Sequence, residues 1–195
     1  MRIAEYRRVT KETDVFVKCS LDWSWIYKIS TWIWFLDHML EQLSRQSFID
    51  IEIKATWDIQ IDDHHLVEDV AIVLWEVILS ALWKKDWINR FASSITPMDE
   101  SLIETAIDLS NRSYLVFNVD FKREQIWQLS TEMVEHFFYS LSSSLRASIH
   151  INERYSRNTH HLVEGIFKSF WRTLRNAIYI DPRNKWILPT TKWKI

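Results

Sequence analysis

The chain has 195 residues, a formal net charge of −2, a hydrophobic content of 47% and a single cysteine. This length suits one domain or two small halves that share a core, and the low charge gives no electrostatic case for a nucleic acid or membrane partner. An intrachain disulfide is excluded, no run of residues is long enough to span a membrane, and the first residues lack the apolar core of a signal peptide. We therefore expect a cytoplasmic protein.

Alternating β-branched and aromatic residues predict strands, and apolar residues at helical spacing predict helices. In the first part of the chain we expect strands over residues 2–9, 13–21, 26–30 and 49–55 and helices over 34–46 and 64–82. Residues 22–25 lie where a hairpin turn belongs, and Asp62 and Asp63 supply capping chemistry before the second helix. The order is three strands, a helix, a strand and a helix.

The same order then repeats. It predicts strands over residues 90–95, 102–110, 114–121 and 148–152, helices over 131–145 and 158–177, and a turn over 96–100. The tail has two prolines and little periodicity, which is typical of an extended arm. The sequence thus predicts two half-repeats over residues 1–87 and 88–180 in one compact domain, followed by an arm over 181–195.

The phrase His-His-Leu-Val-Glu occurs twice, at residues 64–68 and 160–164. On a helix, the first histidine and the glutamate of each phrase lie on one face, while the second histidine is turned by roughly 100°. One phrase therefore offers a His/Glu pair to one metal ion and a spare imidazole to another. Two solvated amphipathic helices with a chance repeat are the plainer alternative, which the matched positions in two similar halves disfavour.

The two phrases lie 96 residues apart, and His38 and His136 lie 98 residues apart. This near-equality indicates an internal duplication that pairs His38 with His136. Six imidazoles and two carboxylates then divide into two sites of three histidines and one glutamate. Such a donor set suits first-row transition ions and favours the harder ones such as manganese, with positions left open for a substrate. A zinc site built on cysteines is excluded.

Other polar residues are weaker candidates. Arg90, Arg112 and Lys192 could bind an anionic group such as phosphate, although each alone is more often a solvated surface charge. Glu12 could serve as a general acid or base, although nothing but its residue type indicates it.

Seven segments together resemble imidazoleglycerol-phosphate dehydratase. They are RVTKET at 8–13, FLDHML at 35–40, DDHHLVED at 62–69, PMDE at 97–100, DLSNR at 108–112, NTHHLVE at 158–164 and PTTK at 189–192. The resemblance is in register from about residue 2 to residue 195, and the double His-His motif together with FLDHM is highly specific.

The resemblance implies an α/β (α+β) fold of two duplicated β-β-β-α-β-α halves, with the helices between two four-stranded sheets, as in the second domain of ribosomal protein S5. It implies a homo-oligomeric shell of twenty-four subunits with metal sites between neighbours. It also implies a hydro-lyase of L-histidine biosynthesis that converts D-erythro-imidazole-glycerol phosphate to imidazole-acetol phosphate. In that family two Mn²⁺ ions bind the substrate ring as an imidazolate.

Site residues carried over by the resemblance fall into three groups. The metal ligands are His38, His64, His65, Glu68, His136, His160, His161 and Glu164. The proton-transfer residue is Glu12. The substrate-binding residues are Glu12, Gln46, Arg90, Arg112, Thr190, Thr191 and Lys192. Helix geometry assigns His64 and Glu68 to one ion and His160 and Glu164 to the other. Gln46 and Ser47 depart from the family, which usually has His-Gly there.

Two alternatives from other classes stay open. One is a non-catalytic metal-binding shell protein, which would not require Glu12, Arg90, Arg112 or Lys192. The other is a dimetal hydrolase, for which no separate nucleophile or water-positioning motif is evident.

The chain has one glycine and 12 tryptophans. Tryptophan stands where the resembled family has glycine at Trp23, Trp25, Trp32, Trp57, Trp75, Trp83, Trp87, Trp127, Trp186 and Trp193. A bulky side chain is strained at the positive φ that glycine allows. We hypothesise that the gene uses UGA as a glycine codon, decoded here as tryptophan.

Overall fold

The computed structural model describes residues 2–57, 61–82, 85, 87–184 and 189–190. Thr191, Lys192, Trp83, Trp186 and Trp193 lie outside these residues.

The first half contributes one sheet and two helices. Their bounds are β1 (Ile3–Val9), β2 (Thr13–Ser20), β3 (Tyr27–Ser30), α1 (Trp34–Ser47), β4 (Asp50–Trp57) and α2 (His64–Leu82). The sheet has the strand order β1-β2-β4-β3, in which β3 and β4 are parallel and the other pairs are antiparallel.

The second half repeats this arrangement with one insertion. Its elements are β5 (Phe91–Met98), β6 (Ser101–Asp108), β7 (Tyr114–Asn118), β8 (Gln125–Ile126), β9 (Leu129–Ser130), α3 (Glu132–Leu145), β10 (Ser148–Tyr155) and α4 (Thr159–Ala177), before a short 3₁₀ turn, Pro182–Asn184. Its sheet has the order β5-β6-β10-β7, again with one parallel pair, β7 and β10. The inserted β8 and β9 form a small hairpin.

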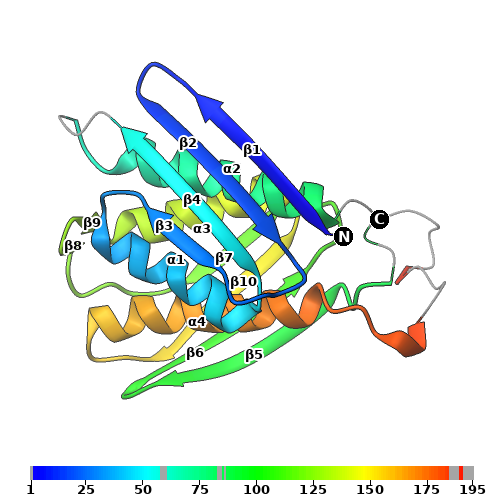
Figure 1. Cartoon of the computed structure of the whole chain (residues 1–195). Helices are drawn as coiled ribbons and strands as arrows, with labels where there is room; N and C mark the ends of the chain where they lie inside the picture. Colours follow the sequence, from blue (N-terminus) through cyan, green and yellow to red (C-terminus); the bar gives the residue numbers. More distant parts are fainter. Residues whose placement is uncertain (1, 58–60, 83–84, 86, 185–188, 191–195) are drawn as a thin grey trace.

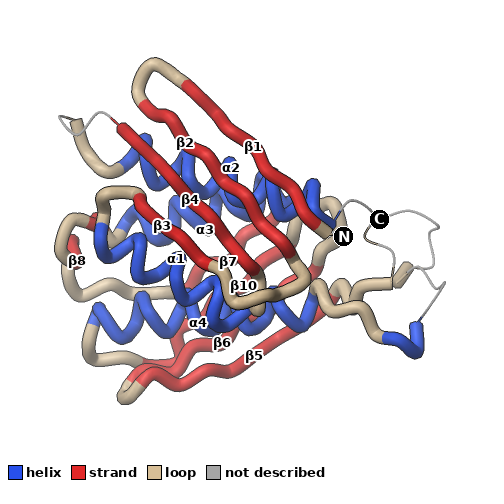
Figure 2. The backbone as a smooth tube through the Cα atoms, viewed as in Figure 1, coloured by secondary structure: helices blue, strands red, loops and turns tan. Residues whose placement is uncertain are grey.

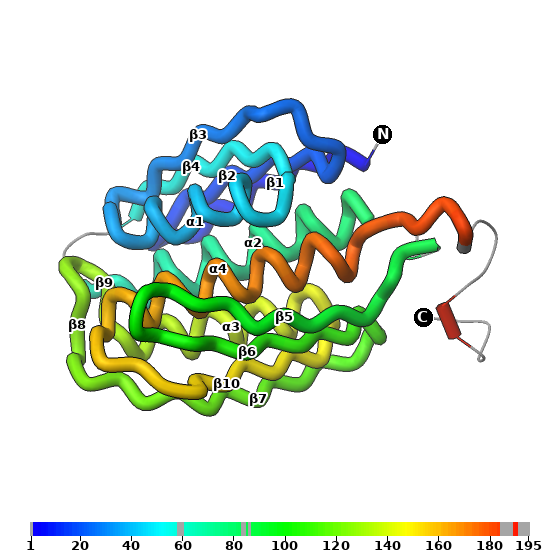
Figure 3. Tube along the Cα trace, turned by 90° about the horizontal axis from the view of Figure 1, so that it is seen from below, coloured from blue at the N-terminus to red at the C-terminus, as the bar shows by residue number. Residues whose placement is uncertain are grey.

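The four helices lie between the two sheets, as Figures 1 and 3 show from two directions. Figure 2 separates the helical layer from the strands by colour. Each sheet has one face toward the helices, which is why β2 alternates buried Thr13, Val15, Val17 and Cys19 with less buried neighbours. The predicted α+β fold with two four-stranded sheets is confirmed.

The helices pair across the halves. Helix α1 packs on α4, and α2 packs on α3. Trp171 of α4 donates its indole N–H to the backbone carbonyl of Met39 in α1 at 3.1 Å, and its ring stacks on Trp75 of α2. The two halves therefore share one core, although the predicted boundary at residues 87 and 88 stays a prediction.

Some predicted local features differ from the structure. Residues 22–25 do not close a hairpin, because β4 lies between β2 and β3 in the sheet. The predicted turn over 96–100 is wrong, since β5 continues through Pro97 to Met98 and the turn is Asp99–Glu100. Pro97 is tolerated because β5 is an edge strand, where a missing N–H leaves no ladder bond unmade. The strand predicted over 148–152 extends to Tyr155, and the β8–β9 hairpin was not predicted.

Among the described residues, four tryptophans have a left-handed backbone. Their φ angles are 75° at Trp25, 67° at Trp32, 68° at Trp87 and 54° at Trp127. This region favours glycine and is strained for bulky side chains. All four stand at positions where the family resemblance implies glycine.

Candidate metal centre

One cluster of metal-binding side chains joins α2 to α3. His64, Glu68 and His136 each offer a ligand atom, and these atoms all lie within 4.8 Å of one another. His136 Nε2 lies 3.2 Å from Glu68 Oε1, yet it is buried and makes no hydrogen bond among the described residues. A buried imidazole nitrogen that lies against a carboxylate without a hydrogen bond to it is a suitable position for a metal ion shared by the two groups.

A second cluster joins α1 to α4. His38 Nε2 lies 3.7 Å from Glu164 Oε1, and His160 Nε2 lies 3.5 Å from Glu164 Oε2. Lys168, one turn further along α4, places its Nζ 2.7 Å from Glu164 Oε1. Burial raises the pKa of Glu164, but the hydrogen bond and charge of Lys168, with smaller contributions from His38 and His160, outweigh burial and lower the pKa overall. The buried Glu164 is therefore held as a carboxylate.

The capping residues fix the first turn of each ligand helix. The Asp62 carboxylate accepts a hydrogen bond from the His64 amide at 3.0 Å, and the Asn158 side chain accepts one from the His160 amide at 2.9 Å. The predicted capping role of Asp62 is thus observed. Asp63 instead accepts bonds from the amide and hydroxyl of Ser130, which attaches the β8–β9 hairpin to the start of α2.

The second histidine of each phrase points to different partners. His65 Nδ1 lies 3.4 Å from Glu12 Oε2 in the β1–β2 turn. His161 Nδ1 lies 2.9 Å from Glu100 Oε2 and its Nε2 lies 3.7 Å from Asp99 Oδ2, both in the β5–β6 turn. The hydrogen bond between His161 and Glu100 raises the pKa of His161 and lowers the pKa of Glu100.

The predicted ligands therefore gather into two triads that combine the two halves of the chain. We call His64, Glu68 and His136 the α2/α3 triad, and His38, His160 and Glu164 the α1/α4 triad. The duplication relates His38 to His136 by position. His38 of the first half contacts Glu164 of the second half, and His136 of the second half contacts Glu68 of the first. His65 and His161 belong to neither triad, as the turn of the helix predicts.

Two polar residues at these sites were missed from the sequence. Lys168 stands four residues after Glu164, a spacing that could have indicated the ion pair. Glu100 lies in the PMDE segment at 97–100, which contributes to the family resemblance. Nothing in the sequence indicates that Glu100 contacts His161.

The arginine candidates gather at the other end of the molecule. Arg90 Nε and a terminal nitrogen lie 2.7 and 3.2 Å from the two carboxylate oxygens of Asp108, and its other terminal nitrogen donates to the Pro189 carbonyl at 2.9 Å. Arg112 reaches the same Asp108 at 3.8 Å. Thr190 follows Pro189 directly. Arg90, Arg112 and Thr190 are therefore brought together, as expected of residues that bind one group.

Gln46 lies apart from this group. It stands in the last turn of α1, where its side-chain oxygen accepts a hydrogen bond from Arg172 of α4 at 3.4 Å.

A whole helix separates the arginines from the α1/α4 triad. The Arg90 amide donates to the carbonyl of Ala177, the last residue of α4, at 2.9 Å, whereas His160 and Glu164 stand in the first two turns of that helix. At 1.5 Å per residue, the two positions are roughly 25 Å apart. Figure 1 shows the full length of helix α4. One small substrate cannot contact both groups in the same chain.

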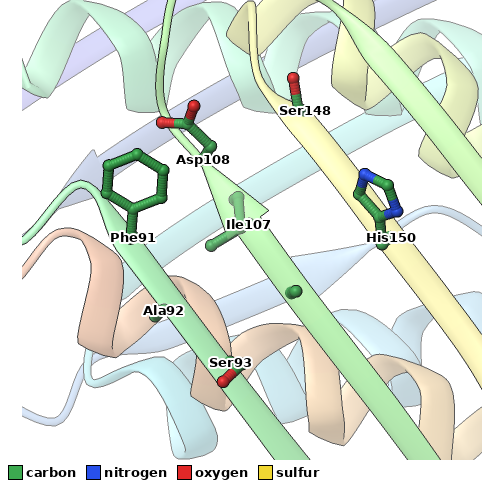
Figure 4. A pocket seen from close by; sticks show the side chains of 8 residues that line it. Phe91, Ala92, Ser93, Ile107, Asp108, Ser148 and His150 are labelled. Atoms are coloured by element: carbon green, nitrogen blue, oxygen red, sulfur yellow. The ribbon is translucent and has the colours of Figure 1, made fainter.

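A hollow of about 600 Å³ lies on the outer face of the second sheet. Figure 4 shows Phe91, Ser93, Asp108 and His150 around it. Neither triad lines this hollow, so His150, the seventh histidine, is not a candidate ligand of either. Asp108 lines the hollow and also forms an ion pair with Arg90.

The fold and the two triads define a class: a duplicated α+β protein with two clusters of histidine and glutamate side chains near the start of its helices. A family model of imidazoleglycerol-phosphate dehydratase matches residues 31–174. The dehydratase of Chloroherpeton thalassium is 50% identical over 92% of this chain and 92% of that protein. The chloroplastic dehydratase of Pisum sativum is 44% identical over 98% of this chain and 68% of that protein. The chain belongs to the imidazoleglycerol-phosphate dehydratase family.

Solved structures agree with this assignment. The crystal structure of imidazoleglycerol-phosphate dehydratase from Staphylococcus aureus superposes with a TM-score of 0.82 at 34% identity, covering 92% of this chain and 99% of that one. The structure from Pyrococcus furiosus gives a TM-score of 0.82 at 33% identity, covering 97% and 100%. No helix among the described residues is long and apolar enough to cross a membrane.

Proposed function

We propose that the chain is a hydro-lyase of L-histidine biosynthesis, which dehydrates D-erythro-imidazole-glycerol phosphate to imidazole-acetol phosphate with two Mn²⁺ ions. The two His-His-Glu triads in a chain of this family carry the proposal. Each triad supplies two imidazole nitrogens and one carboxylate, a set that suits Mn²⁺ and leaves coordination positions for a substrate.

The residues fit the ions. The α2/α3 triad would hold one ion and the α1/α4 triad the other, and the buried His136 Nε2, which lies beside Glu68 without a hydrogen bond, supports the first assignment. His65 and His161, which point out of their own triads, would complete the coordination of ions held by neighbouring subunits. The bound metals would stabilise negative charge on the imidazole ring of the substrate.

Glu12 would move the proton. Its carboxylate contacts His65, and its side chain is about half exposed, so a substrate beside the metal ligands can reach it. A carboxylate near a metal site and open to the substrate has the geometry that proton transfer requires.

The phosphate would be bound by Arg90, Arg112, Thr190, Thr191 and Lys192, and Gln46 of α1 would be a separate contact to the substrate. Because the arginines lie roughly 25 Å from the α1/α4 triad of the same chain, they would serve the metal site of another subunit. This separation supports a homo-oligomer, for which we propose the twenty-four-subunit shell. We also propose a cytoplasmic location.

The test is turnover and metal content in purified protein. We expect Mn²⁺-dependent loss of water from the substrate, which Glu12→Gln lowers strongly but to a measurable residual rate while metal content is kept. Metal binding without any turnover would favour the metal-binding shell, and release of inorganic phosphate would favour a dimetal hydrolase.

A mixing experiment tests the shared site. Glu164→Gln and Arg112→Ala proteins, each nearly inactive alone, should regain activity when dissociated and reassembled together, because some sites then combine intact residues from both. No recovery from correctly assembled mixtures would contradict a site shared between subunits.

A further inference from the structure

The turn that carries Glu12 is attached to the ligand helix α2 through Asp69. Thr13, directly after Glu12, donates its hydroxyl to the carboxylate of Asp69, and Arg8 of strand β1 forms an ion pair with the same carboxylate. Asp69 and Thr13 are 6% and 4% exposed. A buried carboxylate with two partners is a rigid connection, because water cannot replace either partner.

The turn itself is closed by its own hydrogen bonds. The Thr10 amide donates to the Thr13 carbonyl at 2.9 Å, and the Thr10 hydroxyl accepts the amides of Glu12 and Thr13 at 3.1 and 2.9 Å. The turn therefore moves as one body. Its position over α2 depends on what holds it from outside.

Asp69 and His65 stand four residues apart on α2 and so lie on one face of the helix. Glu12 contacts His65, and its neighbour Thr13 contacts Asp69. Glu12 and Thr13, which are adjacent in the sequence, thus contact His65 and Asp69, which lie one helical turn apart on the same face of α2. We propose that Asp69, with Arg8 and Thr13, is a positioning residue that sets Glu12 over His65. This inference rests on the proposed function, in which Glu12 moves the proton.

The experiment is a double-mutant cycle. We expect Asp69→Ala to lower kcat roughly 10- to 100-fold, with KM and bound Mn²⁺ per chain nearly unchanged. In a Glu12→Gln background the same substitution should have almost no further effect, because a misplaced turn matters only while Glu12 acts. Asp14→Asn is the matched control: Asp14 pairs with Arg7 at 2.8 Å across the same two strands, and its loss should leave kcat unchanged.

Equal losses in both backgrounds, or a loss of bound metal, would overturn the proposal and place the effect on the metal ligands. If Asp69→Ala does not fold, Thr13→Val tests the same proposal. This variant removes the hydroxyl that donates to Asp69 and keeps the ion pair between Asp69 and Arg8. Amide hydrogen exchange in metal-free protein gives a readout independent of turnover: residues 10–13 should lose protection in either variant. If the wild-type protein does not dehydrate the substrate, the proposed function fails, while the exchange result still tests the connection.

A separate observation concerns the tryptophans. Trp25, Trp32, Trp87 and Trp127 occupy left-handed backbone, and Trp23, Trp57 and Trp75 bury indole nitrogens that make no hydrogen bond among the described residues. Tryptophan normally pairs its buried N–H and avoids positive φ. With one glycine in the chain, the geometry points to glycine at the four left-handed positions in the natural polypeptide, encoded by UGA.

The codons and the peptides test this directly. We expect UGA in the gene and glycine in peptides from the native host at all four positions; UGG codons would overturn the inference. In recombinant protein, replacing Trp25, Trp32 or Trp127 with glycine should raise the melting temperature by roughly 2–4 °C each. Trp34→Gly is the control, since Trp34 is similarly exposed but stands in helix α1, where glycine brings no such gain.

Discussion

The two halves of the chain share a frame but differ at the residue after each ligand glutamate. Asp69 follows Glu68, whereas Gly165 follows Glu164. Asp69 reaches out to Thr13 and Arg8 of the β1–β2 hairpin. At Gly165, a Cβ atom would lie 2.9 Å from Ile103 Cδ1 in β6, so the helix and the hairpin of the second half pack directly against each other. The helix contacts the hairpin through polar side chains in the first half and through close van der Waals packing at Gly165 in the second half.

The ligand glutamates differ in the same way. Glu164 is buried and paired with Lys168, while the Glu68 side chain is 37% exposed and has Ile72 four residues later. The duplication therefore gave each half a glutamate beside two histidines and changed the surroundings of each carboxylate.

The largest expected effect comes from removing either ligand glutamate. Glu68→Gln and Glu164→Gln should each lose one of two bound Mn²⁺ ions per chain and lower turnover by at least about 100-fold, because a neutral amide is a poor ligand for a hard ion. Metal analysis and a dehydration assay measure both effects. Glu76→Gln, on the exposed face of α2, is the control and should change neither. If one glutamate variant kept both ions, the two triads would not be equivalent metal sites.

Gly165 gives the next largest effect, on stability. Gly165→Ala should destabilise the protein by about 1–3 kcal/mol, because Ile103 must shift. Gly165→Asp should cost at least about 3 kcal/mol, because it buries a charge without the arginine that Asp69 has. Chemical denaturation measures both. Asn176→Asp, which adds the same charge on the exposed side of α4, should change stability by less than about 0.5 kcal/mol. Equal stability of Gly165→Asp and wild type would contradict the close approach.

Lys168 gives a smaller effect that depends on pH. The pKa of Glu164 lies below its usual 4.5 in the folded chain, so its ionisation stabilises the fold above that pH, and this contribution is lost as the pH falls through the lowered pKa. Lys168→Met should therefore destabilise metal-free protein by about 1–2 kcal/mol at pH 7. The difference from wild type should shrink on acidification below pH 4.5. Ile72→Lys, at the matching position after Glu68, tests whether the first triad gains the same acid-sensitive stability.

Most elements of this fold could be predicted from the sequence, because hydrophobic period alone separates strands from helices. Helices α2 and α4 were predicted to within a residue since their apolar faces are long and their caps are adjacent to the ligands. Pro97 misled the prediction of β5, because the sequence does not show that the strand is at an edge. The β8–β9 hairpin has only two residues per strand and leaves no periodic signal.

The ligand residues could be predicted, but their grouping could not. Helix spacing puts His64 with Glu68 and turns His65 away, as the structure shows. That His136 joins the first-half phrase depends on α2 packing against α3, which is a tertiary contact without a local signal. The same holds for the roughly 25 Å between the arginines and the α1/α4 triad, which depends on where the chain leaves α4.

Cys19 should have the smallest effect, and it tests whether the two sheets are equally well packed. It stands in β2 at the place that Ile107 takes in β6, counting from the start of each strand, and the two are 1% and 3% exposed. Burial raises the pKa of the Cys19 thiol to about 12, so native protein at pH 8 should resist a thiol reagent that labels unfolded protein at once. Cys19→Val should change stability by less than about 1.5 kcal/mol, since the site already excludes water and needs only an apolar group of similar volume. Rapid labelling of the native protein would show instead that the first sheet opens around Cys19, although the side chain is buried there.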